Sequence, residues 1–288
     1  MGVGDAVWTL QNSPPTAGSP LRTTARTTLV LADNPGPMTF EGTNSWLLAE
    51  PGDELAVLVD PGPSDGGHLG HLLNAAEQQG VRIASILLTH LHGDHASGAQ
   101  ELAELTGAAI RGAHPSFGAA ALTDGEVIRA GRLEIGVIAT PGHTADSVSF
   151  LLPADRAVLT GDTVLGNGTP AVLPPGGRVG DMLSSLHRLR RLVASTGHVL
   201  LPGHGPAVTE PVRELDRKLA ARHRRIDEIR RALQAGAISI AEITAIVYEG
   251  LDPALRRVAE ATIAANLQHL RSTGSAAPGD QCVQRLDP

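Results

Sequence analysis

The sequence is poor in cysteine and has no long apolar run. Its single cysteine, Cys282, stands in a polar stretch near the C-terminus, which excludes an intrachain disulfide and leaves no thiolate to bind a metal in the core. No stretch of about 18 or more apolar residues is present, so no membrane span is predicted. The N-terminus lacks a basic region followed by an apolar segment, so we expect no signal peptide and a cytoplasmic location.

Aromatic residues and lysine are equally scarce. Aromatic side chains make up only 2% of the 288 residues, so the core must be aliphatic and RNA bases would find few surfaces for stacking. The cationic residues are 22 arginines and one lysine, Lys218. Residues 1–210 hold 11 arginines against 20 Asp and Glu residues, whereas residues 211–288 hold 12 cationic against 10 acidic residues. The acidic first part lacks the basic footprint that is typical of a nucleic-acid enzyme.

Short apolar segments alternate with helical patterns from residue 27 onward, which indicates an α/β architecture. The expected strands are residues 27–31, 44–49, 55–60, 83–88, 108–112, 133–138, 157–161 and 198–201, with further strands and turns between 120 and 150. Helices are expected at residues 66–80 and 97–106, each ending beside a glycine. The Pro- and Gly-rich loop at residues 34–43 is long enough to edge an active site.

After Pro211 the pattern changes to three helical segments, at residues 214–235, 240–248 and 253–271. The chain is therefore expected to divide into a flexible N-terminus, a main α/β domain, a small C-terminal helical or winged-helix-like domain, and a flexible tail. The expected boundaries are residues 1–24, 25–210, 211–272 and 273–288.

The most informative motif follows the apolar segment 83–88. It reads Thr89-His90-Leu91-His92-Gly93-Asp94-His95, and it places three imidazoles and a carboxylate in one tight turn. Imidazole and carboxylate are ligands that hold zinc while leaving a position open for water. Without a metal, so many polar groups packed together would each need a partner.

Three further candidate ligands stand at the ends of later strands, each beside glycine. They are His143 in Pro141-Gly142-His143, Asp162 in Thr160-Gly161-Asp162, and His204 in Gly203-His204-Gly205. Glycine permits a sharp turn of the backbone and leaves space for a substrate close to a metal.

The order HxHxDH, His, Asp, His resembles the metallo-β-lactamase fold superfamily, and the likeness extends into the C-terminal helices. The resemblance implies an αββα sandwich with a metal centre at one edge of its two sheets. It also implies that His90, His92 and His143 bind one zinc ion, that Asp94, His95 and His204 bind a second, and that Asp162 bridges both. Iron or manganese could replace zinc. In this pattern a metal-bridging hydroxide is the nucleophile, Asp94 also holds it in line, and Asp60 supports a ligand histidine by a hydrogen bond.

Aspartate at position 162, rather than the cysteine common in true metallo-β-lactamases, directs the resemblance toward the endoribonuclease- and thioesterase-like members. The favoured interpretation is a zinc-dependent hydrolase of an ester or thioester, with a small-molecule or acyl-carrier substrate. A metal-dependent endoribonuclease acting on single-stranded RNA is the alternative, and an iron-dependent sulfur dioxygenase is a minor one. A non-catalytic binding module would be favoured by a lost ligand, and none is lost. Homo-oligomerisation stays open.

Two features of the C-terminal part have a structural and a functional interpretation. The arginines of the first C-terminal helix are typical of a solvated helix face, or they could clamp a phosphate, a carboxylate or a coenzyme tail. These residues are Arg222, Arg224, Arg225, Arg230 and Arg231. Tyr248, the only tyrosine, is expected to be packed rather than to contact substrate.

Removal of residues 273–288 tests whether the tail is only a flexible extension. We expect the truncated protein to keep its hydrolytic rate and its melting temperature, because this polar segment contributes no apolar surface to a core. Activity assays and thermal unfolding of both proteins would check this. A large loss of either property would contradict the assignment.

Overall fold

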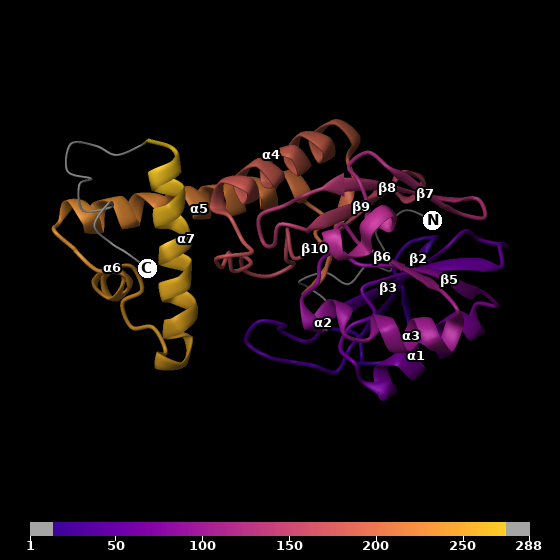
Figure 1. Ribbon diagram of the computed structural model, residues 1–288. Coiled ribbons are helices and arrows are strands. Elements are labelled where there is room, and N and C mark those ends of the chain that lie inside the picture. The colour runs from indigo at the N-terminus through magenta and orange to yellow at the C-terminus, as the bar shows by residue number, and fades with distance from the viewer. Residues whose placement is uncertain (1–13, 275–288) are drawn as a thin grey trace.

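Strands of almost unbroken apolar sequence form two sheets in the computed structural model, which describes residues 14–274 (Figure 1). The first sheet has the order β1-β2-β3-β4-β5-β6 and the second the order β11-β10-β9-β8-β7. The strands of the first sheet are β1 (Leu21–Arg22), β2 (Thr27–Leu31), β3 (Asn44–Ala49), β4 (Leu55–Val59), β5 (Arg82–Leu87) and β6 (Ala109–Arg111). Those of the second are β7 (Val127–Ala130), β8 (Leu133–Ala139), β9 (Val148–Leu152), β10 (Ala157–Gly161) and β11 (Val199–Pro202).

The helices of residues 14–274 are α1 (Gly66–Gln78), α2 (Gly93–Ala96), α3 (Ala99–Thr106), α4 (Val179–Thr196), α5 (Pro211–Gln234), α6 (Ile240–Val247) and α7 (Arg256–Ser272). Four of them, α1, α3, α4 and α5, cover the outer faces of the sheets. Short 3₁₀ segments lie at Pro115–Ala120, Pro153–Asp155 and Pro253–Leu255. The αββα sandwich expected from the sequence is therefore present, and helices follow it.

The apolar side chains separate into layers that explain the strand sequences. Between the sheets, residues such as Trp46 and Leu48 of the first sheet pack with Phe150 and Leu159 of the second. Helices α1 and α3 pack on the outer face of the first sheet, and α4 and α5 on that of the second. Strands β2 and β3 are buried along their whole length because both faces of their sheet are covered. The edge strand β7 alternates between exposed and buried residues.

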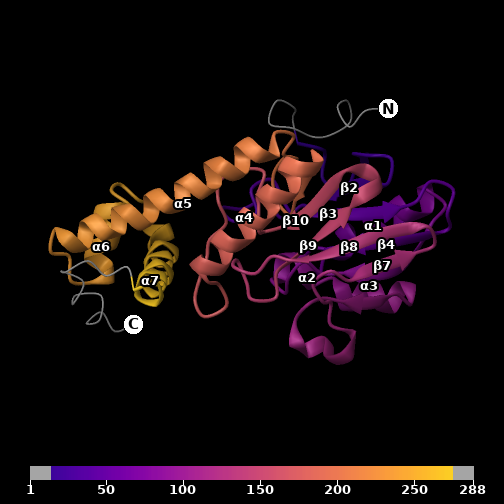
Figure 2. The same ribbon diagram turned by 90° about the horizontal axis from the view of Figure 1, so that it is seen from above.

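Helix α5 connects the sandwich to the last two helices. Its 24 residues span about 36 Å, and Figures 1 and 2 show α6 and α7 beside the layered body, at the far end of α5. One apolar cluster continues from Leu189 of α4 through Ile229 of α5 to Ile263 of α7. The C-terminal helices thus share their core with the second sheet.

Most expected elements coincide with observed ones, and the differences are local. Helix α4 was not predicted, although its buried residues Met182, Leu186, Leu189 and Val193 follow a helical repeat. The winged-helix form of the C-terminal prediction needs a β-hairpin, and residues 211–274 contain no strand. Strand β1 lies within the segment expected to be a flexible N-terminus, and it pairs with β2. The domain boundaries stay a prediction.

Parts of the expected flexible ends, residues 1–13 and 275–288, and also Cys282, lie outside the described residues. Among the residues that the structure does describe, no helix is both long and apolar enough to cross a membrane.

Replacement of Ile229 by Ala tests whether the C-terminal helices share one core with the sandwich. Ile229 is completely buried in α5, so the cavity is expected to lower the free energy of unfolding by about 2–5 kcal/mol and to shift a single transition. Ile246→Ala is the control because this side chain in α6 is 56% exposed, and its effect should stay within about 0.5 kcal/mol. A separate early transition, with the main one unchanged, would show that the helices unfold on their own.

Candidate metal centre

Strand ends from both sheets meet at one edge of the sandwich and bring the candidate ligands together. His90 follows β5, His92 is the N-cap of α2, and Asp94 and His95 lie within that short helix. His143, Asp162 and His204 follow β8, β10 and β11. The two sheets are also joined at this edge, since the amide of Asn44 in β3 donates to the carbonyl of Gly203 at 2.8 Å.

Two glycines permit this close approach. A Cβ atom at position 203 would lie 2.6 Å from Cε1 of His95 and 2.7 Å from Oδ1 of Asp162. A Cβ atom at position 161 would lie 2.5 Å from the hydroxyl of Thr89, and the backbone there has a φ of +45°. Larger residues would push the strand ends apart.

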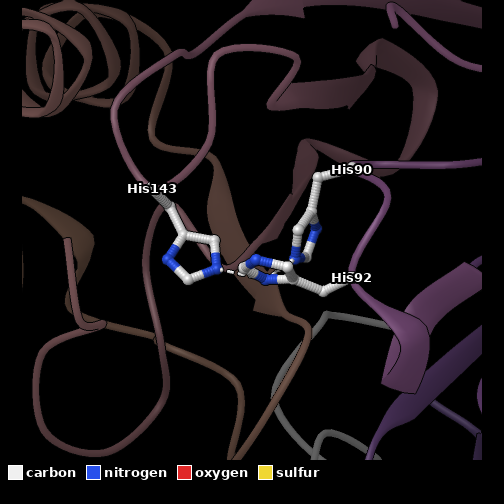
Figure 3. Close-up of side chains that lie close together, drawn as sticks. All are labelled: His90, His92 and His143. Carbon is white, nitrogen blue, oxygen red and sulfur yellow. Dashed lines mark hydrogen bonds between the residues drawn. The ribbon is translucent and has the colours of Figure 1, made fainter. Parts of the chain in front are cut away.

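The first group of candidate ligands consists of His90, His92 and His143. Nδ1 of His92 lies 3.0 Å from Nε2 of His90 and 2.9 Å from Nε2 of His143. Figure 3 shows the three rings directed toward one another, with His90 and His92 on one loop and His143 on another.

The second group consists of Asp94, His95 and His204. Nε2 of His204 lies 3.1 Å from Nε2 of His95 and 3.1 Å from Oδ2 of Asp94. His95 and His204 are fully buried, whereas the side chain of Asp94 is 30% exposed and faces the cavity described below.

Asp162 lies between the two groups. Its Oδ1 atom is 3.4 Å from Nε2 of His95, and its Oδ2 atom is 3.6 Å from Nε2 of His143. Oδ1 is buried and has no hydrogen-bond partner among residues 14–274. The structure thus assembles all seven sequence-predicted residues around this carboxylate.

Hydrogen bonds made by Nδ1 determine which nitrogen carries the proton in three of these histidines. Nδ1 of His95 donates to Asp60, that of His204 to the carbonyl of Gly42 at 3.0 Å, and that of His143 to the carbonyl of Ala171 at 2.8 Å. In a neutral imidazole the other nitrogen then carries only a lone pair. When these three rings are neutral, each therefore directs a bare Nε2 atom into the site.

Bare nitrogens and carboxylate oxygens that face one another across about 3 Å repel unless a cation lies among them. The pKa values of His95 and Asp94 also indicate that the site favours positive charge. Burial opposes a charge on His95, but Asp162 and Asp60 outweigh it and raise the pKa of its imidazole well above the ordinary value. Burial likewise opposes ionisation of Asp94, yet His204 and His95 keep the pKa of that carboxyl below its ordinary value. The donor set therefore fits metal cations that accept nitrogen and oxygen ligands.

Asp60 connects the two groups from behind. Its Oδ2 atom accepts hydrogen bonds from Nδ1 of His95 at 2.8 Å and from the hydroxyl of Thr89 at 2.6 Å, and its Oδ1 atom accepts from the Thr89 amide at 2.8 Å. Because the Thr89 hydroxyl gives its proton to Asp60, its oxygen can accept from Nδ1 of His90, 3.0 Å away. One carboxylate thus orients a ring in each group. The sequence predicted support of a histidine by Asp60, and the relay through Thr89 exceeds that prediction.

A cavity opens in front of the two groups. Besides His92, Asp94, His143 and Asp162, it is lined by Pro37, Met38 and Phe40 of the 34–43 loop and by residues of the loop between β10 and α4, from Leu165 to Gly177. The first loop was expected to edge the site. The second loop was missed, and its only sequence signal was the turn-forming run Pro174-Pro175-Gly176-Gly177.

Helix α5 holds the second loop in place. Nζ of Lys218 donates to the carbonyl of Gly168 at 2.6 Å, and Nη2 of Arg222 donates to that of Pro170 at 2.9 Å. The next residue, Ala171, accepts from His143. Helix α5 is therefore connected to the candidate ligand His143 through the loop that carries the carbonyls of Gly168, Pro170 and Ala171.

Comparison with known proteins places these features in a family. The family model described as "Metallo-beta-lactamase superfamily" matches residues 38–204. An "Atrochrysone carboxyl ACP thioesterase" of Aspergillus fumigatus is 33% identical over 214 residues, which is 73% of this chain and 65% of that protein. The "Lactamase-like protein adaB" of Aspergillus niger is 29% identical over 77% of this chain and 73% of its own length. The chain thus spans slightly less than two thirds of the thioesterase.

A solved structure shows the same fold over nearly the whole chain. It is a "Beta-lactamase domain protein" from Burkholderia ambifaria, and it covers 93% of this chain and 92% of its own with a TM-score of 0.79 and 21% identity.

Replacement of Asp60 by Asn tests whether this carboxylate supports both groups. Asp60 has a φ of +51°, a conformation that Asn also tolerates, so the backbone should be retained. We expect metal affinity to fall about 10–100-fold because His95 and Thr89 lose an anionic acceptor. Metal titration of this variant beside exposed Asp33→Asn would measure the change. Equal affinity in both variants would contradict the role of Asp60.

Proposed function

The chain belongs to the metallo-beta-lactamase superfamily of metal-dependent hydrolases, and from that premise we propose that it is a dizinc thioesterase. The proposed substrate is an acyl thioester on a carrier protein or a small thiol. One observation carries the proposal: candidate ligands of both groups lie close to the Asp162 carboxylate, at the floor of a largely apolar cavity. The printed name of the Aspergillus fumigatus relative supports the thioester as the bond cleaved.

The proposed ligand sets follow the two groups. His90, His92 and His143 would hold one ion, Asp94, His95 and His204 the other, and Asp162 both. Iron or manganese would also accept imidazole and carboxylate ligands. When bound, the ions would supply Lewis-acid polarisation of the thioester carbonyl and a water molecule of lowered pKa.

The chain's own residues would position the reactants. Asp94 projects into the cavity from the floor, and its carboxylate can accept a hydrogen bond from the attacking water and so direct a lone pair at the carbonyl carbon. Met38, Phe40 and Leu165 form apolar walls that can hold the acyl chain and exclude bulk water. In the net reaction the water oxygen bonds to the carbonyl carbon, the carbon–sulfur bond breaks, and the thiolate leaves and takes up a proton.

The C-terminal helices belong to this proposal because they complete the substrate site. Residues 25–210 would form the catalytic domain, and residues 211–272 would border the cavity through the loop that Lys218 and Arg222 hold. Cleavage of RNA finds less support in the structure. Several arginines of this region pair with carboxylates, so they do not form a continuous free cationic face. These pairs are Arg213–Glu210, Arg217–Glu214, Arg225–Glu228, Arg230–Asp227 and Arg256–Glu260.

The direct test compares metal-loaded and chelator-treated protein on two substrates, an acyl-pantetheine thioester and end-labelled single-stranded RNA. We expect thioester hydrolysis that disappears on chelation and returns with zinc, and no cleavage of RNA. Metal analysis of the purified protein separates a zinc hydrolase from an iron-dependent sulfur dioxygenase. Metal-dependent cleavage of RNA without thioester hydrolysis would reject the proposal.

Replacement of Asp94 by Ala tests the proposed positioning role. We expect kcat/KM for the thioester to fall about 10²–10⁴-fold, because the variant loses both a ligand and the acceptor that aligns the water. The melting temperature should change little, since Asp94 is partly exposed and outside the apolar clusters. An undiminished rate of hydrolysis in the Asp94→Ala variant would contradict the two-metal mechanism.

A further inference from the structure

A second pocket adjoins the metal cavity on the side of the C-terminal helices. The two share the lining residues Pro37, Met38, Thr169, Pro170 and Ala171, so a groove runs from the candidate metal centre to α5 and α7. Leu251, Leu255 and Val258 supply an apolar wall at the far end. Arg222 and Arg225 line this far end beside Tyr248, and we call it the arginine pocket.

The charge of the arginine pocket is one-sided. Arg222 and Arg225 are its only charged lining residues, and none of the lining residues in the described part of the chain is Asp or Glu. Arg225 is held in place, since its guanidinium carbon lies 4.1 Å from the ring centre of Tyr248 and its Nη1 atom donates to the carbonyl of Val247 at 3.0 Å. Glu228, 2.9 Å from that Nη1 atom, offsets part of its charge.

The charge of Arg222 is not offset by a carboxylate in this way. Its Nη2 atom donates to Pro170, but its buried Nε atom has no hydrogen-bond partner, and no carboxylate of residues 14–274 lies within ion-pair distance. Burial lowers the pKa of this guanidinium to about 10. Lys218, one turn earlier on α5, shows the contrast: it is buried more completely, and it pairs with Glu214 at 2.9 Å. A partly buried cation without a counter-charge is unfavourable, and an anionic ligand would relieve it.

We propose that the arginine pocket binds an oxyanion of the substrate, a phosphate or a carboxylate, while the thioester lies at the metal centre. This inference rests on the proposed thioesterase function and adds the recognition of charge to it. The oxyanion has two possible sources, which share this chemistry: the phosphate of a phosphopantetheine carrier arm, or an acidic group on the acyl chain. Arg222 supplies the unpaired guanidinium, and the apolar groove accommodates the uncharged chain between the two ends.

The test uses the metal-loaded protein and two matched pairs of compounds. Calorimetry compares 4′-phosphopantetheine with pantetheine, which lacks the phosphate. Kinetics compares glutaryl with pentanoyl thioesters of N-acetylcysteamine, which differ by a carboxylate on the acyl chain. We expect the charged member of one pair to be favoured about 10–100-fold, in Kd or in kcat/KM, as for hydrogen bonds to charged groups. The pair that shows the preference identifies the source.

Arg222→Met should abolish that preference, so the charged compound should lose more affinity or kcat/KM than its uncharged partner. Arg222→Lys keeps the charge but not the fork of donors, so it should retain part of the preference. Arg224→Met is the matched control, because Arg224 is exposed on the same helix and does not line the pocket. Metal content is measured in every variant, since Arg222 also holds the loop beside His143.

Two results would overturn the inference: no preference for charge in either pair, or an equal loss for charged and uncharged compounds in Arg222→Met. The second result would mark Arg222 as a support of the loop only. The binding measurement does not depend on turnover. A phosphate preference without hydrolysis of any thioester would therefore reject the proposed function and keep the pocket, and hydrolysis without any charge preference would do the reverse.

Discussion

Lone pairs that converge at the edge of two sheets are the constraint on which the rest of this structure depends. Nitrogens of His92, His95 and His204 and the oxygens of Asp94 and Asp162 face one another at close range. Such an arrangement is unfavourable in a neutral, dry interior, and only a fold that holds each ring from behind can maintain it. A cation bound among these atoms would relieve a repulsion that the fold imposes, and its binding would then be coupled to folding.

The support for these rings comes in equal part from main-chain carbonyls and from side chains. His204 is held by the carbonyl of Gly42 and His143 by that of Ala171, and both acceptors belong to loops between regular elements. Only Asp60 and Thr89 contribute side chains, and together they orient one ring in each group. The loops thus form the cavity wall and also fix the direction of the ligands, so their length and turns are as important to the site as the strands.

This division explains which features could be predicted from the sequence. The candidate ligands could be identified from the sequence because HxHxDH and the later His, Asp and His carry their chemistry in their side chains. The structure brings them together because each follows an apolar strand. The αββα sandwich followed from the same motif order and from the strand pattern. Carbonyl acceptors such as Gly42 and Ala171 leave no signal, since every residue has a carbonyl.

Other features could not be predicted from the sequence because they depend on its context or on tertiary contacts. Helix α4 has a helical repeat of apolar residues but was obscured by the glycine- and proline-rich segment before it. The arginines of α5 look alike in sequence, yet several are ion-paired whereas Arg222 is partly buried beside Pro170 without a carboxylate. That difference arises from the loop between β10 and α4, which folds against the helix from a distant part of the chain.

The same loop has a consequence for how the two ends of the groove communicate. Pro170 faces α5 and accepts from Arg222, and its neighbour Ala171 accepts from His143. A ligand that draws Arg222 away from Pro170 would shift the free energy of the contact at Ala171, and so the affinity of the site for its cation. Thermodynamic reciprocity then requires the cation to alter the affinity for that ligand by the same factor and in the same direction. Through these two adjacent carbonyls, binding at one end of the groove would change the binding affinity at the other end.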